Sequence, residues 1–243
     1  MQKIDLTPVK CSECPIRHRA VCSRCDGDEL LRLEAMKSYR SYKAGDIILW
    51  RGEPLEFVAS VVSGIANLSK TLEDGRTQMV GLLLPSDFIG RPGRTQVEFD
   101  VTATTDVTLC RFERLSFEKL IDDTPHVAQR LMELALDELD AARGWMILLG
   151  RKTAREKIAT FLDLLASRAV LEHTNGHVRL DMPMTRDQIA NFLGLTLETV
   201  SRQLNALKKD GIIAFSGRRE LDVVDIIALR EATGDDADGG MIV

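Results

Sequence analysis

The chain has 243 residues, 44% of them hydrophobic, and a formal net charge of −5. This length and composition suit a folded protein with one or two cores, and slightly favour two domains. No apolar run approaches the roughly 18 residues that span a membrane, and the first ten residues lack the apolar core of a signal peptide. We therefore expect a cytoplasmic protein without membrane contacts.

The charges are distributed unevenly along the chain. Residues 151–230 carry 13 basic and 10 acidic side chains, whereas residues 1–150 carry 19 and 23. Residues 231–243 hold four acidic side chains and no basic one, and we expect them to form a disordered tail. Only the block 151–230 has a charge balance suited to the phosphates of nucleic acid.

Four of the five cysteines lie in residues 1–35, ahead of any periodic apolar pattern: Cys11, Cys14, Cys22 and Cys25. In a cytoplasmic protein such thiols bind metal or sense redox state more often than they form disulfides. We do not expect so short a segment to build a core. The arginines among the thiols are expected to lower the thiol pKa values and to offset the charge of a thiolate-rich centre; they are Arg17, Arg19 and Arg24.

Two kinds of metal centre fit these thiols. The two Cys-x2-Cys pairs can hold a tetrahedral zinc, although the gap between them is shorter than in most zinc ribbons. An iron–sulfur cluster would use three of these thiols and one from elsewhere, and Cys110 is the only other cysteine. Spacing alone does not decide between zinc and a cluster, and it leaves unliganded thiols open as a third possibility. His18 is expected to be a solvated loop residue rather than a ligand.

Residues 36–124 change to short apolar or alternating runs separated by turns rich in Gly and Pro. The runs cover residues 46–50, 57–62, 65–70, 78–84 and 101–112. Strands of this length and spacing predict a sandwich or barrel. Strict alternation places Cys110 on one face with Thr108 and Phe112, so a buried structural cysteine is the simple alternative to a ligand. Such a barrel could hold a nucleotide, but no compact cluster of acid, base and nucleophile indicates an enzyme.

Residues 125–151 predict one long helix. Its apolar residues recur at alternating steps of four and three: Ala128, Met132, Ala135, Leu139, Ala142, Met146 and Leu149. This heptad spacing is typical of two helices that pack against each other. A helix lying on the core of its own domain is the alternative. We favour a homodimer, because the DNA-binding element described next works in pairs on a two-fold symmetric site.

A further amphipathic helix is predicted over residues 153–168, followed by a loop at residues 173–177. The most specific pattern in the chain then begins at Met184, MTRDQIANFLGLTLETVSRQLNALKKDGII. Thr185 and Gln188 form a capping box at the start of one short helix, and Thr196 caps a second helix that runs to Lys209. Two short helices joined by a turn with Gly predict a helix-turn-helix.

The second of these helices carries hydrogen-bonding side chains on its outward face: Glu198, Thr199, Ser201, Arg202 and Asn205. Arg202 can donate two parallel hydrogen bonds to guanine, and Glu198 can accept one from cytosine. Residues 212–224 predict a strand, a turn and a strand, which is a wing with Arg218 and Arg219 at its tip beside the DNA backbone. We therefore expect residues 152–230 to bind double-stranded DNA.

The order of these parts, together with Glu198-x-x-Ser201-Arg202, resembles the CRP/FNR superfamily of bacterial transcription regulators over nearly the whole chain. The nearest resemblance is to the FNR branch, of the FnrN/FnrL type, whose Cys-x2-Cys-x7-Cys spacing plus one distant cysteine is matched by Cys11, Cys14, Cys22 and Cys110. It implies an α+β fold with an N-terminal β-roll, a long dimerisation helix and a C-terminal winged helix-turn-helix.

The resemblance also implies a function. Those four thiolates would bind an oxygen-labile 4Fe-4S cluster, which leaves Cys25 as a spare or alternative ligand. The intact cluster would favour a homodimer bound to a palindrome of TTGAT-like half-sites, and oxygen would dismantle the cluster. Glu198, Ser201 and Arg202 would contact the half-site. Surface loops of the roll, such as residues 73–75, would touch RNA polymerase.

The sequence departs from the family pattern in two places. The nucleotide-binding branch carries a Gly-Glu pair followed further on by an Arg-Ser pair. Here Gly90 is followed by Arg91 and Pro92, and no Arg-Ser pair follows before Cys110, so cyclic AMP is not expected to bind. Ala142 stands where the best-known FNR relatives carry an acidic residue. Facing carboxylates would oppose pairing, so we hypothesise that dimerisation of this chain depends less on the cluster than in those relatives.

Overall fold

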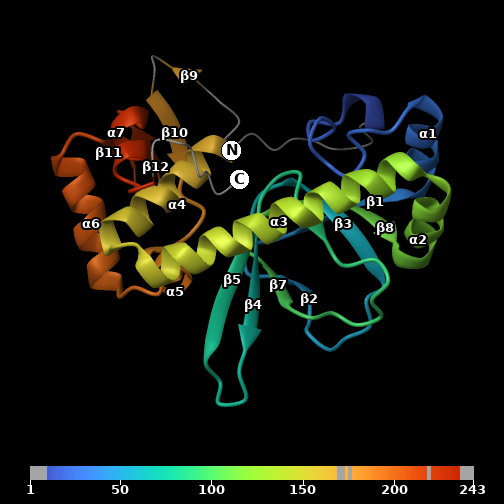
Figure 1. Ribbon diagram of the computed structural model, residues 1–243, viewed down its shortest axis with the longest axis horizontal. Helices are drawn as coiled ribbons and strands as arrows, with labels where there is room; N and C mark the ends of the chain where they lie inside the picture. Colours follow the sequence, from blue (N-terminus) through green and yellow to red (C-terminus); the bar gives the residue numbers. More distant parts are fainter. Residues whose placement is uncertain (1–9, 169–172, 175–176, 218–219, 236–243) are drawn as a thin grey trace. The chain divides into compact units, whose positions relative to one another are not determined.

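The computed structural model describes residues 10–168, 173–174, 177–217 and 220–235. The chain divides into two compact units, Met1–Leu136 and Asp137–Val243. The expected parts are present in the expected order: a β-roll, a long helix and a winged helix-turn-helix (Figure 1). The predicted α+β fold is therefore confirmed. Within the described residues, the helices are all too short or too polar to cross a bilayer.

The β-roll consists of two four-stranded antiparallel sheets. One has the order β1-β8-β3-β6 and the other the order β2-β7-β4-β5. The strands are β1 (Lys37–Tyr42), β2 (Ile47–Leu49), β3 (Phe57–Ser63), β4 (Ala66–Thr71), β5 (Thr77–Leu83), β6 (Phe88–Ile89), β7 (Asp100–Ala103) and β8 (Val107–Glu113). The single run expected at residues 101–112 is in fact two strands, because the chain leaves one sheet and enters the other at residues 104–106.

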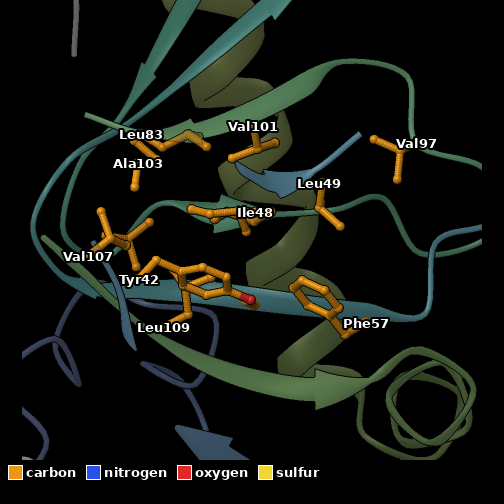
Figure 2. Close-up of a cluster of buried hydrophobic side chains, with 14 of the residues drawn as sticks. Tyr42, Ile48, Leu49, Phe57, Leu83, Val97, Val101, Ala103, Val107 and Leu109 are labelled. Atoms are coloured by element: carbon orange, nitrogen blue, oxygen red, sulfur yellow. The ribbon is translucent and has the colours of Figure 1, made fainter. Parts of the chain in front are cut away.

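Apolar side chains from both sheets fill the interior of the roll. In Figure 2, Ile48, Val101 and Leu83 of one sheet face Tyr42 and Leu109 of the other. Residues two apart along a strand share a face. Since Leu109 points into this core, its neighbour Cys110 points to the outside of the same sheet, as the alternation predicted.

The cysteine segment packs on that outer face. It contains the short 3-10 helix η1 (Cys11–Glu13) and leads into α1 (Gly27–Met36). Ile16, Val21 and Leu33 are buried in one cluster with residues of β3, β8, α2 (Arg114–Asp123) and α3 (Pro125–Arg151). As expected, the segment does not build a core of its own, and its few apolar side chains complete a core supplied mainly by other elements.

Helix α3 matches the predicted range of 27 residues. Its first turns, with Val127, Leu131 and Leu134, pack against the cysteine segment and the roll. In the second unit, Leu148 of the same helix is fully buried and Trp145 makes an edge-on contact with Phe192, with ring centroids 4.5 Å apart. Each of these residues directly precedes one of the predicted heptad positions in the sequence. They therefore lie on another face of the helix.

The second unit contains α4 (Ala154–Arg168), α5 (Arg186–Leu193), α6 (Leu197–Lys209) and α7 (Ile226–Glu231). Its sheet has the order β11-β12-β10-β9, formed by β9 (His173–Thr174), β10 (His177–Asp181), β11 (Ile213–Phe215) and β12 (Glu220–Val223). Helix α6 ends at the predicted residue. The loop expected at residues 173–177 is instead part of a β9–β10 hairpin.

The end of the chain is described as far as Asp235. Helix α7 includes Glu231, the first residue of the expected tail. Thr233 is buried, and the Asp235 carboxylate pairs with Lys152 Nζ at 2.6 Å. Residues 236–243 of the expected tail lie outside the described residues.

Candidate metal centre and nucleic-acid interface

The four thiols named for the cluster gather on the outer face of the β1-β8-β3 sheet. Cys110 is buried in β8, Cys14 and Cys22 pack half-buried against the same apolar cluster, and Cys11 is buried in η1. Burial raises the pKa of the Cys110 thiol well above its usual value. Cys11, Cys14 and Cys22 raise that pKa further, which indicates that these three thiols lie near Cys110. Segments almost 90 residues apart in the sequence thus meet here.

Cys25 lies in the same apolar cluster but has different charged neighbours. Burial raises the pKa of its thiol to about 12, and Cys22, Glu29 and Asp26 raise it while Arg17 lowers it. Two carboxylates are therefore among the charged neighbours of this thiol. A thiolate at Cys25 is therefore disfavoured by neighbouring negative charge as well as by burial.

The expectation that arginines lower the thiol pKa values is confirmed for Arg17 at Cys22 and Cys25, although the net shift at both thiols is upward. Arg17 lowers the pKa of Cys22, but burial outweighs it and raises that pKa to about 11. The guanidinium of Arg17 donates hydrogen bonds to the backbone carbonyls of Cys22 (2.7 Å), Ser23 (2.8 Å) and Cys25 (2.9 Å). Arg17 therefore fixes the shape of the loop. Arg24 is directed elsewhere, as described below.

Two side chains that the sequence analysis did not single out contact the thiols. Lys37 Nζ donates to Cys11 Sγ at 3.4 Å. Tyr39 is hydrogen-bonded to the Cys14 thiol, and its ring lies under the Lys37 ammonium, 5.3 Å from the ring centroid. Both belong to β1, a strand of mostly polar residues. Once that strand is placed, the alternation of Lys37 and Tyr39 is the signal that puts them on one face.

Polar contacts join the cysteine segment to α3. Arg24 pairs with Glu133 at 2.7 Å, and Arg130 donates to the backbone carbonyl of Arg19 at 2.7 Å. Glu29 of α1, which also completes a capping box with Asp26, lies 3.0 Å from Nδ1 of His126. These contacts link the loop that carries the thiols to the first turns of the long helix. His18 is exposed, as expected.

The heptad positions of α3 are not covered within a single chain. The side chains of Met132, Leu139, Met146 and Leu149 are 60%, 45%, 74% and 43% exposed. Ala135 and Ala142 are exposed as well. We call this set of six residues the α3 seam. Large apolar side chains so exposed in a row indicate a surface that another molecule covers.

Capping residues fix the helix-turn-helix as the sequence predicts. Thr185 and Gln188 form the full capping box of α5, and the Thr196 hydroxyl accepts from the backbone N–H of Thr199 at 3.2 Å. Gly194 ends α5 in the left-handed conformation (φ 61°), where an L side chain would be strained. The turn between α5 and α6 thereby has a defined geometry.

Helix α6 presents the predicted face. Val200, Leu204 and Leu207 are buried. The residues named for DNA contact are exposed or half-exposed on the opposite side: Glu198, Thr199, Ser201, Arg202 and Asn205. Hydrogen bonds within the helix and from its cap hold the pKa of Glu198 below its usual value, so its carboxylate is charged at neutral pH.

Basic side chains flank this face. The guanidinium of Arg186 lies 3.4 Å from Ser201 Oγ and 5.9 Å from the ring centroid of Phe215 in β11, and the Lys208 ammonium lies 5.6 Å from the same centroid. Strands β11 and β12 form the expected wing. Arg218 and Arg219, named for its tip, lie outside the described residues.

Comparisons with known proteins agree with both units. Residues 39–124 match the cyclic nucleotide-binding domain family, and residues 156–232 match the Crp-like helix-turn-helix domain family. The chain is 60% identical to the transcriptional activator protein FnrL of Cereibacter sphaeroides, over 96% of each chain. It is also 38% identical to the nitrogen fixation regulation protein FixK of Bradyrhizobium diazoefficiens, over 91% of this chain and 94% of that one.

A solved structure of a related protein has a similar fold. The structure of FixK2 from Bradyrhizobium japonicum superimposes with a TM-score of 0.75 at 35% identity, over 83% of this chain and 99% of that one. The present chain therefore combines a cyclic nucleotide-binding fold with a Crp-like helix-turn-helix domain. The chain belongs to the CRP/FNR family of transcription regulators.

Proposed function

We propose that this protein is an oxygen-responsive transcriptional activator whose cysteines Cys11, Cys14, Cys22 and Cys110 hold a 4Fe-4S cluster. The cluster controls dimerisation through the α3 seam, and the dimer binds a palindromic operator. The observation that carries the proposal is the gathering of N-terminal thiols beside Cys110 on the outer face of the roll. Cys14 and Cys22 share one apolar cluster with Cys110, a cluster that also contains Cys25, and Cys11 contacts Lys37 of the adjacent strand β1. FnrL, of 60% identity, is named a transcriptional activator.

The thiols suit a cluster better than a single zinc ion. Zinc with Zn–S bonds of about 2.3 Å needs sulfur atoms about 3.8 Å apart. Among the described residues, no three of these sulfur atoms lie within 4.8 Å of one another. A core of four irons and four sulfides holds its thiolates farther apart than one ion does. The apolar wall and the Lys37 ammonium suit a site that is buried and negatively charged.

When bound, the cluster supplies oxygen sensitivity, because dioxygen oxidises and dismantles it. The chain's own residues transmit its presence. Ligation by Cys22 would fix the segment that carries Arg24, and Arg24 pairs with Glu133, the residue that follows Met132 of the α3 seam. Arg130 supports the same segment through the carbonyl of Arg19. A loop held in this arrangement favours one position of the first turns of α3 relative to the cysteine segment.

The α3 seam pairs with its copy in a second chain. Its heptad spacing matches the geometry of two parallel or antiparallel packed helices, and in one chain its apolar side chains face water. Ala142 places no charge in the seam, so metal-free chains also associate to some extent in this proposal. Sedimentation of the metal-free protein at micromolar concentration tests this point: dimers are expected, and a clean monomer would refute it.

Helix α6 lies in the major groove of each half-site. Arg202 and Glu198 hydrogen-bond to base edges, and Thr199, Ser201 and Asn205 lie on the same face. Arg186 and Lys208 are placed to approach phosphates at its border. The β4–β5 hairpin, with the exposed residues 73–75 at its turn, contacts RNA polymerase in this proposal.

Anaerobic purification tests the proposal directly. We expect a brown protein with iron and sulfide near four of each per chain, whose visible absorption is lost in air. A colourless protein holding one zinc per chain would favour the alternative, a cluster-free regulator with zinc-bound or redox-active cysteines.

The small-molecule sensor is the other alternative. It predicts a thermal shift with a nucleotide and no effect of Cys14→Ser. The side chains that fill the roll (Figure 2) and the Gly90-Arg91-Pro92 sequence argue against a nucleotide there.

A further inference from the structure

Two hydroxyl-bearing residues flank Cys110 within the sheet. In the antiparallel pairing of β1 with β8, Tyr39 lies opposite Cys110. In the pairing of β3 with β8, Ser60 lies opposite Cys110 on the other side. Directly opposed residues project to the same face of a sheet, with Cβ atoms about 4.5–5.5 Å apart. Tyr39, Cys110 and Ser60 therefore form one row across three strands (Figure 1 shows β1, β8 and β3 side by side).

Ser60 has no evident structural role. Its neighbours two residues away, Val58 and Val62, belong to the apolar cluster on the outer face, so the Ser60 side chain points to the same side as the cysteines. Ser60 is 2% exposed, and its hydroxyl has no hydrogen-bond partner within the described part of the chain. Burying a hydroxyl without a partner destabilises a fold, and such groups call for an explanation.

Tyr39 already contacts a thiol. Its phenol is hydrogen-bonded to Cys14. A tyrosine phenol carries its proton at neutral pH and can act as an O–H donor. Protonated thiols are weak acceptors, whereas metal-bound thiolates and sulfides carry negative charge and accept hydrogen bonds more strongly. Metal binding would thus give both hydroxyls better partners.

We propose that Ser60 and Tyr39 are positioning residues that donate hydrogen bonds to sulfur atoms of the metal centre, Ser60 at Cys110 and Tyr39 at Cys14. This inference rests on the proposed function. Donors to cluster sulfur atoms withdraw negative charge and stabilise the more reduced state, which is one of the means by which proteins set cluster potentials. The two hydroxyls therefore raise the reduction potential of the centre and slow its oxidation in air.

The variants Ser60→Ala and Tyr39→Phe remove one hydroxyl each and keep the remaining shape. The matched controls are Tyr42→Phe and Ser41→Ala on the same strand β1. Tyr42 points into the roll, and Ser41 bonds to Thr108 on the exposed surface. Each protein is loaded with cluster anaerobically. The readouts are iron content, the midpoint potential from a dye-mediated titration, and the rate at which visible absorption is lost in air-saturated buffer.

We expect both hydroxyl variants to bind as much iron as the parent protein, to have a lower midpoint potential, and to bleach about two- to tenfold faster, the change that one ordinary hydrogen bond accounts for. Ser60→Thr, which keeps the hydroxyl, should restore the parent potential. Controls should match the parent.

The outcomes separate the two proposals. If the parent protein binds no iron, the proposed function fails. If the parent binds the cluster and all variants share its potential and bleaching rate, the inference about Ser60 and Tyr39 is overturned while the proposed function stands. An equal shift in the controls would overturn it too, since the effect would then be one of packing.

Discussion

At the scale of single residues, Cys110 and Cys25 contrast most clearly, because both thiols are buried but their charged neighbours differ. Cys11, Cys14 and Cys22 surround Cys110. Cys22 and then the carboxylates of Glu29 and Asp26 act on Cys25, and burial dominates at both thiols. The sequence marks both residues equally as cysteines. The structure separates them by their charged neighbours, and the proposal uses this difference to name Cys110 a ligand and Cys25 a spare.

The contrast leads to a prediction about iron content. Cys110→Ser should lose most of the iron bound under anaerobic conditions, because it removes one of four ligands. Cys25→Ser should keep it. Iron and sulfide per chain are measured after anaerobic reconstitution, with the parent protein prepared alongside. If Cys25→Ser loses the iron and Cys110→Ser retains it, the proposed ligand set is wrong.

Arg202 allows a second prediction at this scale. Its side chain is exposed on the outward face of α6, in reach of base edges in the major groove. We expect Arg202→Ala to weaken binding to the operator by about 1–3 kcal/mol and to relax the choice of one base. Titrations of a labelled operator and of random DNA at the same salt concentration measure this. An equal loss on both would mean that Arg202 contacts only phosphate.

At the scale of elements, the amount that could be predicted depends on where each element finds its stabilising contacts. The helix-turn-helix was predicted almost to the residue, because caps, a turn Gly and apolar spacing all lie within its own sequence. Helix α1 was missed although the Asp26–Glu29 capping box was visible. Strand β1 was missed because it is an edge strand of alternating polar residues, paired only with β8.

Helix α3 carries a prediction about assembly. Leu139→Glu should convert the dimer to a monomer, because a carboxylate buried opposite its own copy without a partner costs on the order of 3–5 kcal/mol. Gln129→Glu is the control, since it adds a carboxylate to the same helix outside the α3 seam. Analytical ultracentrifugation of both variants measures whether each is a monomer or a dimer. A dimer of unchanged affinity in Leu139→Glu would place the interface elsewhere.

The Arg24–Glu133 ion pair carries a prediction about transmission. Both side chains are partly exposed, at 50% and 26%, so the pair contributes only about 0.2–1 kcal/mol. Arg24→Ala should therefore bind a full cluster but reduce the ratio of dimer affinities with and without cluster, by up to about fivefold.

Arg32→Ala is the matched control for Arg24→Ala. Arg32 lies in α1, eight residues after Arg24, and pairs with Asp123 of α2 rather than with α3. Dimer dissociation constants are measured for loaded and metal-free protein in each case. The role given to Arg24 would be wrong if both variants changed the ratio equally.

At the scale of the whole molecule, the candidate metal centre and the DNA-binding face belong to different units, and α3 is the one element that has residues in both. A signal from the cysteines therefore has a continuous helix along which to act. The sequence predicted the parts and their order. It could not predict Lys37, Tyr39 or Ser60 as neighbours of the thiols, because only the pairing of β1 and β3 with β8 brings them there.

The central claim is that closure of the thiols on an oxygen-labile centre sets the DNA-binding state of the dimer. The most direct test is the occupancy of a palindromic operator by one preparation, divided into an anaerobic half and an air-exposed half, with Arg202→Ala as the control for specific binding. We predict that the anaerobic protein occupies the operator at concentrations where the air-exposed protein leaves it free. Equal occupancy by the two halves would contradict the claim.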